Sequence, residues 1–304
     1  MPIETIDRLE AELEIESSRV CADVDAFFSE LLTPPGDGRD RLYAAMRHAA
    51  VGGGKRLRPL LTVAACQLFA MDRARAIRVG TAIEAIHVYS LIHDDLPCMD
   101  DDDMRRGKPT VHKAFGVAEA VLAGDSLHAM AFEVLAAEET HEDPFIRSEL
   151  VLELARAAGP SGMAGGQMLD IDAEGRPLDI PAITRLQQLK TGALIEYSVE
   201  AGCIMNRMPH EARTPYRGYA RNIGLAFQIA DDLIDHSGDA EAAGKRTGKD
   251  REKGKATFVS VLGEDRARQQ ARMLVEQACE HLAEHGSEAD LLRAVARFAI
   301  ERDR

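Results

Sequence analysis

The segment TAIEAIHVYSLIHDD, residues 81–95, decides the fold class because it joins a long apolar helical run to a pair of aspartates. Residues 81–92 are apolar on most of a helical surface, and a helix of that kind is buried. The apolar run 220–234 repeats the arrangement and carries Asp231 and Asp232, with Asp235 directly behind. We therefore expect two buried helices that bring their acids to the mouth of a helix bundle above an apolar interior.

The rest of the chain also has the pattern of helices. Ala, Leu, Glu and Arg dominate, and apolar residues recur three and four apart, as in residues 60–68. No strand-like alternation is sustained. Gly and Pro mark the expected breaks, which are residues 33–38, 51–54, 159–166, 175–181, 209–215 and 237–254. The pattern predicts one all-α domain, residues 1–304, of about ten or more helices.

Composition excludes several classes of protein. The 304 residues carry a net charge of −14, no Trp and only 5% aromatic residues, which disfavours a nucleic-acid binder. The five cysteines are scattered and odd in number, so we expect no disulfide framework or zinc site, and a reducing, cytoplasmic location. No signal-peptide pattern opens the chain, and no apolar stretch reaches 18 residues, so stable membrane insertion is not expected.

The two acidic clusters predict a Mg²⁺ site. Two carboxylates at roughly 4 Å repel by about 4 kcal/mol at an effective dielectric of 20, and an apolar lead-in strengthens that repulsion. Asp231 and Asp235 share one helix face, and the break at Pro97 lets Asp100 swing back toward Asp94. A cation between such oxygens turns repulsion into binding, and hard oxygen ligands suit Mg²⁺. The alternative for either cluster alone is a solvated helix end.

Basic residues gather beside these acids in an otherwise acidic chain. Lys and Arg bind phosphate groups, and neighbouring glycines let the backbone approach an anion closely. Taken singly, each basic residue could form a surface salt bridge. Together they predict a substrate with anionic head groups and an apolar tail. The groups are Lys55, Arg56 and Arg58; Arg105, Arg106 and Lys108; Lys190 with Thr191; and Lys245, Arg246, Lys249 and Lys255.

An ordered set of motifs across nearly the whole chain resembles the trans-isoprenyl diphosphate synthases, or polyprenyl synthetases, and most of all their bacterial farnesyl type. The motifs are GGKRLRP (53–59), HVYSLIHDDLPCMD (87–100), RRG (105–107), GGQ (165–167), KTG (190–192) and FQIADDLID (227–235). The resemblance implies the isoprenoid synthase type I fold, in which helices surround a deep central cavity. It also implies a homodimer and three Mg²⁺ ions per site.

The same resemblance implies roles for individual residues. Asp94, Asp100 and Asp231 would hold Mg²⁺ with support from Asp95 and Asp235, and Lys190 and Lys245 would join the acids in catalysis. The allylic diphosphate would contact Arg105, Lys190, Thr191, Gln228 and Lys245. Isopentenyl diphosphate would contact Lys55, Arg58, His87, Arg106 and Lys255, while Gln167 and Asp170 would line the site.

Product length should depend on the side chains below the first acids. Tyr89 lies five residues before Asp94, about 7.5 Å along a helix, and Ser90 lies four before. A tyrosine ring there would stop a growing chain early, and in the family this tends to mean the 15-carbon product. Geranylgeranyl diphosphate synthase remains an alternative, as does ordinary core packing for Tyr89. A class I terpene cyclase is a weaker alternative, because it would not need the second diphosphate site that Lys55, Arg58 and Arg106 suggest. A noncatalytic synthase subunit is also weaker, because both acidic clusters are intact.

Overall fold

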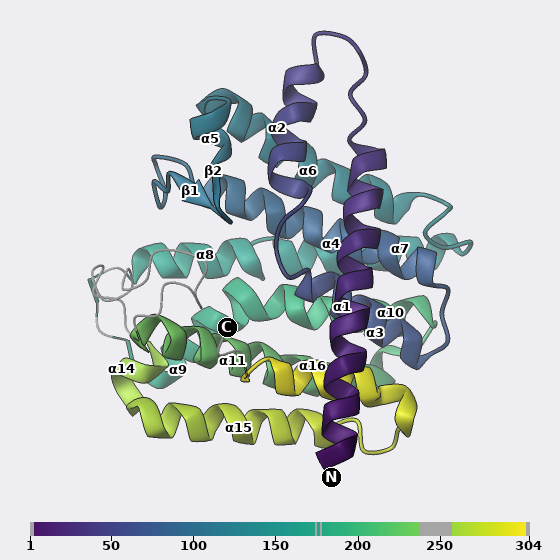
Figure 1. Cartoon of the computed structure of the whole chain (residues 1–304), viewed down its shortest axis with the longest axis vertical. Helices are drawn as coiled ribbons and strands as arrows, with labels where there is room; N and C mark the ends of the chain where they lie inside the picture. Colours follow the sequence, from purple (N-terminus) through teal and green to yellow (C-terminus); the bar gives the residue numbers. More distant parts are fainter. Residues whose placement is uncertain (1–2, 174, 177, 238–256, 302–304) are drawn as a thin grey trace.

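The computed structural model describes residues 3–173, 175–176, 178–237 and 257–301 (Figure 1). More than ten α-helices lie within these ranges, which confirms the all-α prediction. The elements are α1 (Ile3–Leu31), α2 (Asp40–Ala50), α3 (Leu57–Leu68), α4 (Arg73–Asp94), β1 (Met104–Arg105), β2 (Lys108–Pro109), α5 (Val111–Ala114), α6 (Val117–Ala136), α7 (Pro144–Ala158), α8 (Met163–Asp172), α9 (Ile180–Gln187), η1 (Gln188–Gly192), α10 (Ala193–Met205), η2 (His210–Arg213), α11 (Thr214–Ser237), α14 (Phe258–Leu262), α15 (Glu264–Glu280), η3 (Ser287–Ala289) and α16 (Asp290–Phe298).

Helix α4 forms the centre of the bundle. The Asp72 carboxylate caps its first turn by accepting a hydrogen bond from the Arg75 amide. The helix packs against α3 and α6, with α1, α2 and α10 also in contact. Twelve of the 17 residues 76–92 are buried and the other five are half-buried, so the prediction of a buried helix over 81–92 is confirmed. A buried helix of this length holds its last residue, Asp94, at a defined place.

Helix α11 differs from the sequence expectation. Ala220, Ile223, Ala226 and Ile229 are buried on one side, but Arg221 is exposed. The expectation that residues 220–234 are buried all round is therefore wrong, because α11 packs on α10 and α15 with only part of its surface. Its acid-bearing end lies on the same side of the molecule as the end of α4, at the left in Figure 1.

One predicted break, residues 159–166, is shorter than expected, because α8 begins at Met163 and contains Gly165 and Gly166. Lys190 and Thr191 lie within the π-helical turn η1 between α9 and α10. A Cβ atom on Gly166 would come within 2.1 Å of the Lys190 backbone nitrogen. Position 166 therefore requires glycine because the backbones of α8 and η1 are in contact there. In the sequence alone, the same glycine indicates a break.

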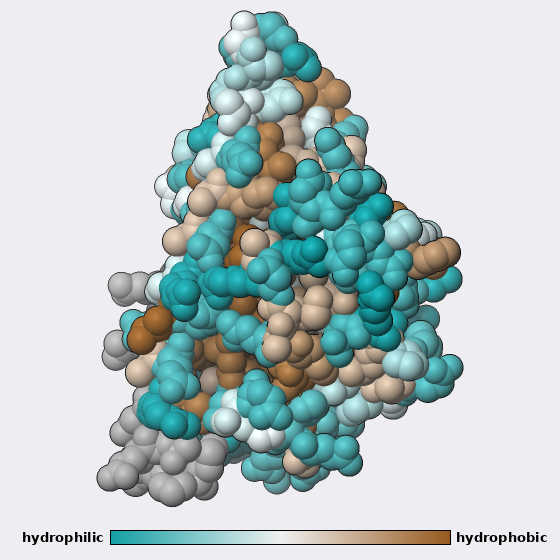
Figure 2. All heavy atoms as spheres, turned by 90° about the vertical axis from the view of Figure 1, so that its right-hand side faces the viewer, coloured by the Kyte–Doolittle hydropathy of each residue, from teal (hydrophilic) through white to brown (hydrophobic). Residues whose placement is uncertain are grey.

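A short hairpin follows the first acidic cluster. Strands β1 and β2 have two residues each and pair antiparallel, and they are the only strands in the described ranges. Arg106 and Gly107 form the turn with φ of 51° and 74°. On the face seen in Figure 2, hydrophilic side chains cover most of the surface, with smaller apolar areas between them. None of the helices described has both the length and the apolar character to cross a bilayer.

Arg56 ties the glycine-rich loop before α3 to the bundle. Its guanidinium is 1% exposed and lies 2.9 Å from Glu84 on α4 and 2.7 Å from Asp25 on α1. It also donates to the Ala50 carbonyl oxygen. Removing one partner of a buried ion pair leaves an uncompensated charge, which is far more costly than loss of a surface pair. Arg56 thus has a structural role, and it holds the loop that carries Lys55 and Arg58.

The Arg56→Met variant should lose about 3–5 kcal/mol in free energy of unfolding, since it leaves Glu84 buried without its main partner. Urea denaturation followed by circular dichroism measures the loss. The double variant Arg56→Met/Glu84→Met should recover most of it. Arg39→Met, which removes an exposed pair with Asp37, is the matched control and should change little. Equal stability of Arg56→Met and the control would contradict this role.

Candidate functional site

A cavity of about 680 Å³ opens between the ends of α4, α8, α9 and α11. This volume is in the range of small-molecule sites in proteins. It brings together most of the residues predicted for the site, from five separate places in the sequence. They are Lys55, Arg58, His87, Tyr89, Ser90, Asp94, Gln167, Asp170, Lys190, Thr191, Gln228, Asp231 and Asp235.

The acids of both clusters line the same cavity. Asp94 comes from the end of α4, and Asp231 and Asp235 come from α11. The Asp100 amide donates to the Asp94 carbonyl oxygen at 2.8 Å, so the chain turns back at Pro97 as expected. Burial raises the pKa of the Asp94 carboxyl to about 6; Lys190 opposes this rise and the neighbouring Asp100 adds to it. Asp94 is thus a carboxylate that lacks sufficient positive charge in the protein alone.

Asp95 has a different environment from Asp94. It is 3% exposed and accepts hydrogen bonds from Arg105 Nε at 2.7 and 2.9 Å, while Arg105 Nη2 lies 2.6 Å from it. Both residues line a smaller neighbouring pocket and lie outside the lining of the large cavity. The Asp95–Arg105 pair therefore stabilises the turn after α4 from outside the large cavity. Each of the two charges has a partner within the protein.

A second part of the cavity lining, here called the basic wall, consists of Lys55, Arg58 and His87. The Arg58 Nε atom is buried and has no hydrogen-bond partner among the described residues. Burial lowers the pKa of the Arg58 guanidinium, and Glu84 partly opposes this. Burial also places the pKa of His87 well below its ordinary value, with further lowering by Arg58 and Arg106. His87 is therefore a neutral imidazole at pH 7, held beside cations that favour an anion.

Arg106 is positioned by the glycine-rich loop. Its guanidinium lies against Gly53 and Gly54, and Nη1 donates to the Gly53 carbonyl oxygen at 3.0 Å. A Cβ on Gly54, whose φ is +85°, would come within 2.5 Å of the Arg106 guanidinium carbon. Only glycine allows this contact and this backbone conformation together. Arg106 lines the smaller pocket beside Arg105 and not the large cavity.

Lys190 extends from the π-helical turn toward Asp170 on α8, with 2.7 Å between Nζ and Oδ2. Turns of this kind are frequent at functional sites because they redirect side chains within a continuous helix. Thr191, the next residue, also lines the cavity. The Lys190 ammonium group thus places a positive charge on the α8 side of the cavity, and this charge acts on Asp94.

The deep part of the cavity is apolar and aromatic. Tyr89 lies at the cavity wall, 4.9 Å from the ring of His128 and 5.8 Å from that of His93 between ring centroids. Sequence reasoning missed His93, although it lies one helical turn after Tyr89. It also missed a set of apolar lining residues, namely Met163, Leu178, Ile183, Leu186, Phe227 and Ile234. Phe227 and Ile234 lie within the motif FQIADDLID, whereas the only signal of the other four in the sequence is ordinary helical periodicity.

Two predicted residues, Lys245 and Lys255, lie outside the described residues. Their assigned contacts stay predictions. Asp232 also lines the cavity, and it accepts a hydrogen bond from the Phe258 amide at 2.8 Å, which joins α11 to α14.

Comparison with known proteins agrees with this geometry. The sequence profile of the family described as polyprenyl synthetase matches residues 39–297. The chain is 43% identical to farnesyl diphosphate synthase of Escherichia coli strain K12, over 85% of this chain and 88% of that protein. It is 39% identical to geranylgeranyl pyrophosphate synthase 4 of Arabidopsis thaliana, over 86% of this chain and 71% of that protein. A crystal structure of an FPP/GFPP synthase from Zymomonas mobilis superposes with a TM-score of 0.88 at 56% identity, covering 96% and 99% of the two chains. The chain therefore belongs to the polyprenyl synthetase family.

Proposed function

We propose that this chain is a farnesyl diphosphate synthase, a prenyltransferase that joins isopentenyl diphosphate to dimethylallyl and then geranyl diphosphate. The observation that carries the proposal is one cavity whose lining combines acids from two helix ends, the basic wall and apolar side chains. Such a cavity matches a substrate with a diphosphate head and a hydrocarbon tail. The relatives with the farnesyl name support the choice of product.

The acids have the donor chemistry that Mg²⁺ requires. Asp94, Asp100 and Asp231 would hold the ions, with Asp95 and Asp235 in support and three ions in a loaded site. The raised pKa of Asp94 supports this assignment, because a crowded, buried carboxylate gains most from an added cation. When bound, Mg²⁺ would stabilise the negative charge that grows on the diphosphate leaving group.

The basic residues would orient the two head groups. Lys190, Thr191 and Gln228, with Arg105 and Lys245, would hold the allylic diphosphate near the acids. Lys55, Arg58 and His87, with Arg106 and Lys255, would hold isopentenyl diphosphate on the basic wall. A neutral His87 can donate one hydrogen bond to a phosphate oxygen without contributing a proton to the reaction.

The reaction breaks the allylic C1–O bond and releases diphosphate. The double bond of isopentenyl diphosphate then forms a bond to C1, and the adduct loses a proton to the released diphosphate. Apolar residues such as Phe227 and Leu186 line the cavity and would exclude water that could capture the allylic cation. No side chain of the protein has to act as a nucleophile in this sequence.

We further propose a homodimer in the cytoplasm. Exposed apolar side chains on α6, among them Val117 and Leu122 at 51% and 54% exposure, offer an apolar surface for a second copy. All five cysteines are free, which fits a reducing compartment.

Activity is tested by incubation with Mg²⁺, isopentenyl diphosphate and dimethylallyl diphosphate, followed by chromatography of the prenyl alcohols. The wild type should give the 15-carbon alcohol. Asp231→Asn should lower the rate on the order of 10²- to 10³-fold, because it removes charge that stabilises the transition state. Asp265→Asn, an exposed aspartate on α15, should keep the wild-type rate. A cyclic hydrocarbon product would contradict the proposal. So would activity that appears only when a different protein subunit is added.

The Tyr89→Ala variant should lengthen the product, since it removes the ring that narrows the cavity below Asp94. Its chromatogram should move from the 15-carbon alcohol toward 20 carbons or more. Tyr89→Phe keeps the ring and is the matched control, with an unchanged profile expected. A wild-type product that already has 20 carbons would favour the geranylgeranyl alternative, and an unchanged profile in Tyr89→Ala would refute this role of the ring.

The raised pKa of Asp94 makes the metal-free protein less stable at high pH. The folded state binds this proton more tightly than the unfolded state, whose value is 3.8, so stability falls as pH rises from about 4 through about 6. In the presence of a chelator, Asp94→Asn should exceed the wild type by about 1–3 kcal/mol at pH 8. The difference should shrink toward zero near pH 4. A difference that does not change with pH would disprove the assignment.

A further inference from the structure

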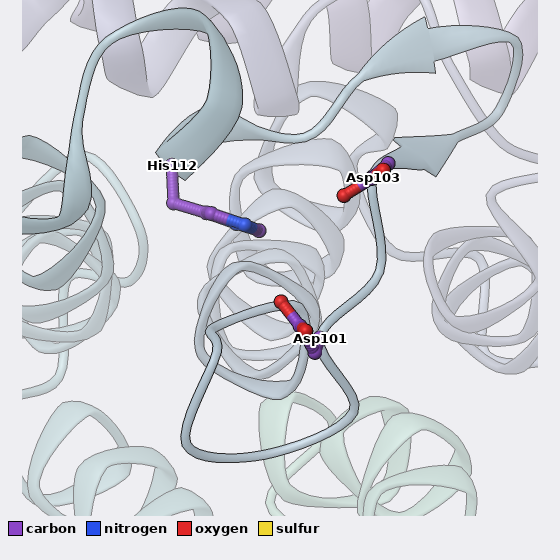
Figure 3. Close-up of side chains that lie close together, drawn as sticks. All are labelled: Asp101, Asp103 and His112. Atoms are coloured by element: carbon purple, nitrogen blue, oxygen red, sulfur yellow. The ribbon is translucent and has the colours of Figure 1, made fainter.

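Three possible metal ligands converge just behind the first acidic cluster. Asp101 and Asp103 lie on the loop between α4 and β1, and His112 lies on α5 (Figure 3). One ligand atom from each residue lies within 4.8 Å of the other two. None of the three lines the large cavity or belongs to the residues proposed above for Mg²⁺.

His112 is the observation that distinguishes this group from an ordinary acidic surface. Its side chain is buried, with 7% exposure, and its ring points toward the two aspartates in Figure 3. Its Nε2 atom has no hydrogen-bond partner among the described residues. A buried imidazole nitrogen normally has a partner, so this atom lacks the interaction that its burial requires.

Thr110 sets the tautomer of the ring. Its hydroxyl lies 3.1 Å from His112 Nδ1 and 3.4 Å from the Asp103 carbonyl oxygen, to which it donates. The hydroxyl oxygen can therefore accept a hydrogen bond from Nδ1–H. In this tautomer the proton is on Nδ1, and Nε2 carries a lone pair. Metal-binding histidines are held in the same way, through a hydrogen bond at the other ring nitrogen. One ring nitrogen of His112 and one oxygen of each carboxylate lie within 4.8 Å of one another.

We propose that Asp101, Asp103 and His112 bind a divalent transition-metal ion of the Mn²⁺ or Zn²⁺ class. One imidazole nitrogen with two carboxylate oxygens suits these ions better than Mg²⁺, which prefers oxygen ligands alone. Lys113 Nζ lies 2.7 Å from Asp103 Oδ1, so the ion takes the second oxygen of that carboxylate or displaces the lysine. Water completes the coordination.

The site would secure the turn that presents Asp100. Asp101 follows Asp100 directly, and its amide donates to the Leu96 carbonyl oxygen at 3.2 Å. A metal that joins this turn to α5 ties both ends of the β1–β2 hairpin together. The inference goes beyond the proposed prenyl transfer and does not depend on it.

The test is Mn²⁺ binding to the full chain in the Asp94→Asn/Asp231→Asn background, which removes two ligands proposed for the catalytic ions. Electron paramagnetic resonance should detect one Mn²⁺ per chain, and pulsed spectra should show coupling to one ¹⁴N nucleus. Added in that background, His112→Gln should abolish the coupling and weaken binding at least tenfold. Asp101→Asn, at an exposed position, should also weaken binding at least tenfold with the fold retained by circular dichroism.

Asp102→Asn is the matched control, because it removes the same charge from the same loop outside the three ligands. It should bind Mn²⁺ as the background protein does, and Zn²⁺ should displace the ion in both. Equal weakening by Asp102→Asn, or ¹⁴N coupling that survives His112→Gln, would overturn the proposal. So would the absence of bound Mn²⁺ in the background protein. None of these outcomes measures activity, so the prenyl-transfer proposal stands or falls separately.

Discussion

Burial of carboxylates at the ends of two helices is the constraint on which the rest of this structure depends. Helix α4 is almost wholly buried, and it delivers Asp94 to a place where burial opposes its charge. Helix α11 brings Asp231 and Asp235 to the same cavity. A protein that places such groups together without a bound cation loses stability. The arrangement makes sense for a site that takes up positive charge together with its substrate.

Arginines pair with carboxylates that lie beside the cavity. Arg105 pairs with Asp95 behind the acidic turn, and Arg56 pairs with Glu84 and Asp25 behind the glycine-rich loop. Each pair is largely withdrawn from solvent and shapes the backbone next to a cavity residue. The internal pairs therefore leave Asp94, Lys55, Arg58 and His87 to face the cavity.

The sequence predicted the features that residues close together in the chain determine. It missed the features that depend on contacts between distant parts of the chain. Residues 81–92 could be identified as a buried helix from apolar periodicity, and the return of Asp100 followed from Pro97. Gly165 and Gly166 were taken as a break, because a sequence cannot show that the Lys190 backbone approaches Gly166. Arg56 could not be separated from Lys55 and Arg58, since only packing shows which basic residue is turned inward. Apolar lining residues such as Met163 and Leu186 lie outside every motif.

The long first helix holds the glycine-rich loop in place, although the matched family segment begins only at residue 39. Asp25 on α1 accepts a hydrogen bond from the Gly52 amide at 3.1 Å and from Arg56 at 2.7 Å. Truncation at the boundary of the matched segment would therefore remove the contacts of Asp25 with Gly52 and Arg56 that hold the glycine-rich loop. Every motif would remain in the truncated chain. The catalytic unit of this protein is larger than the part of it that sequence comparison delimits.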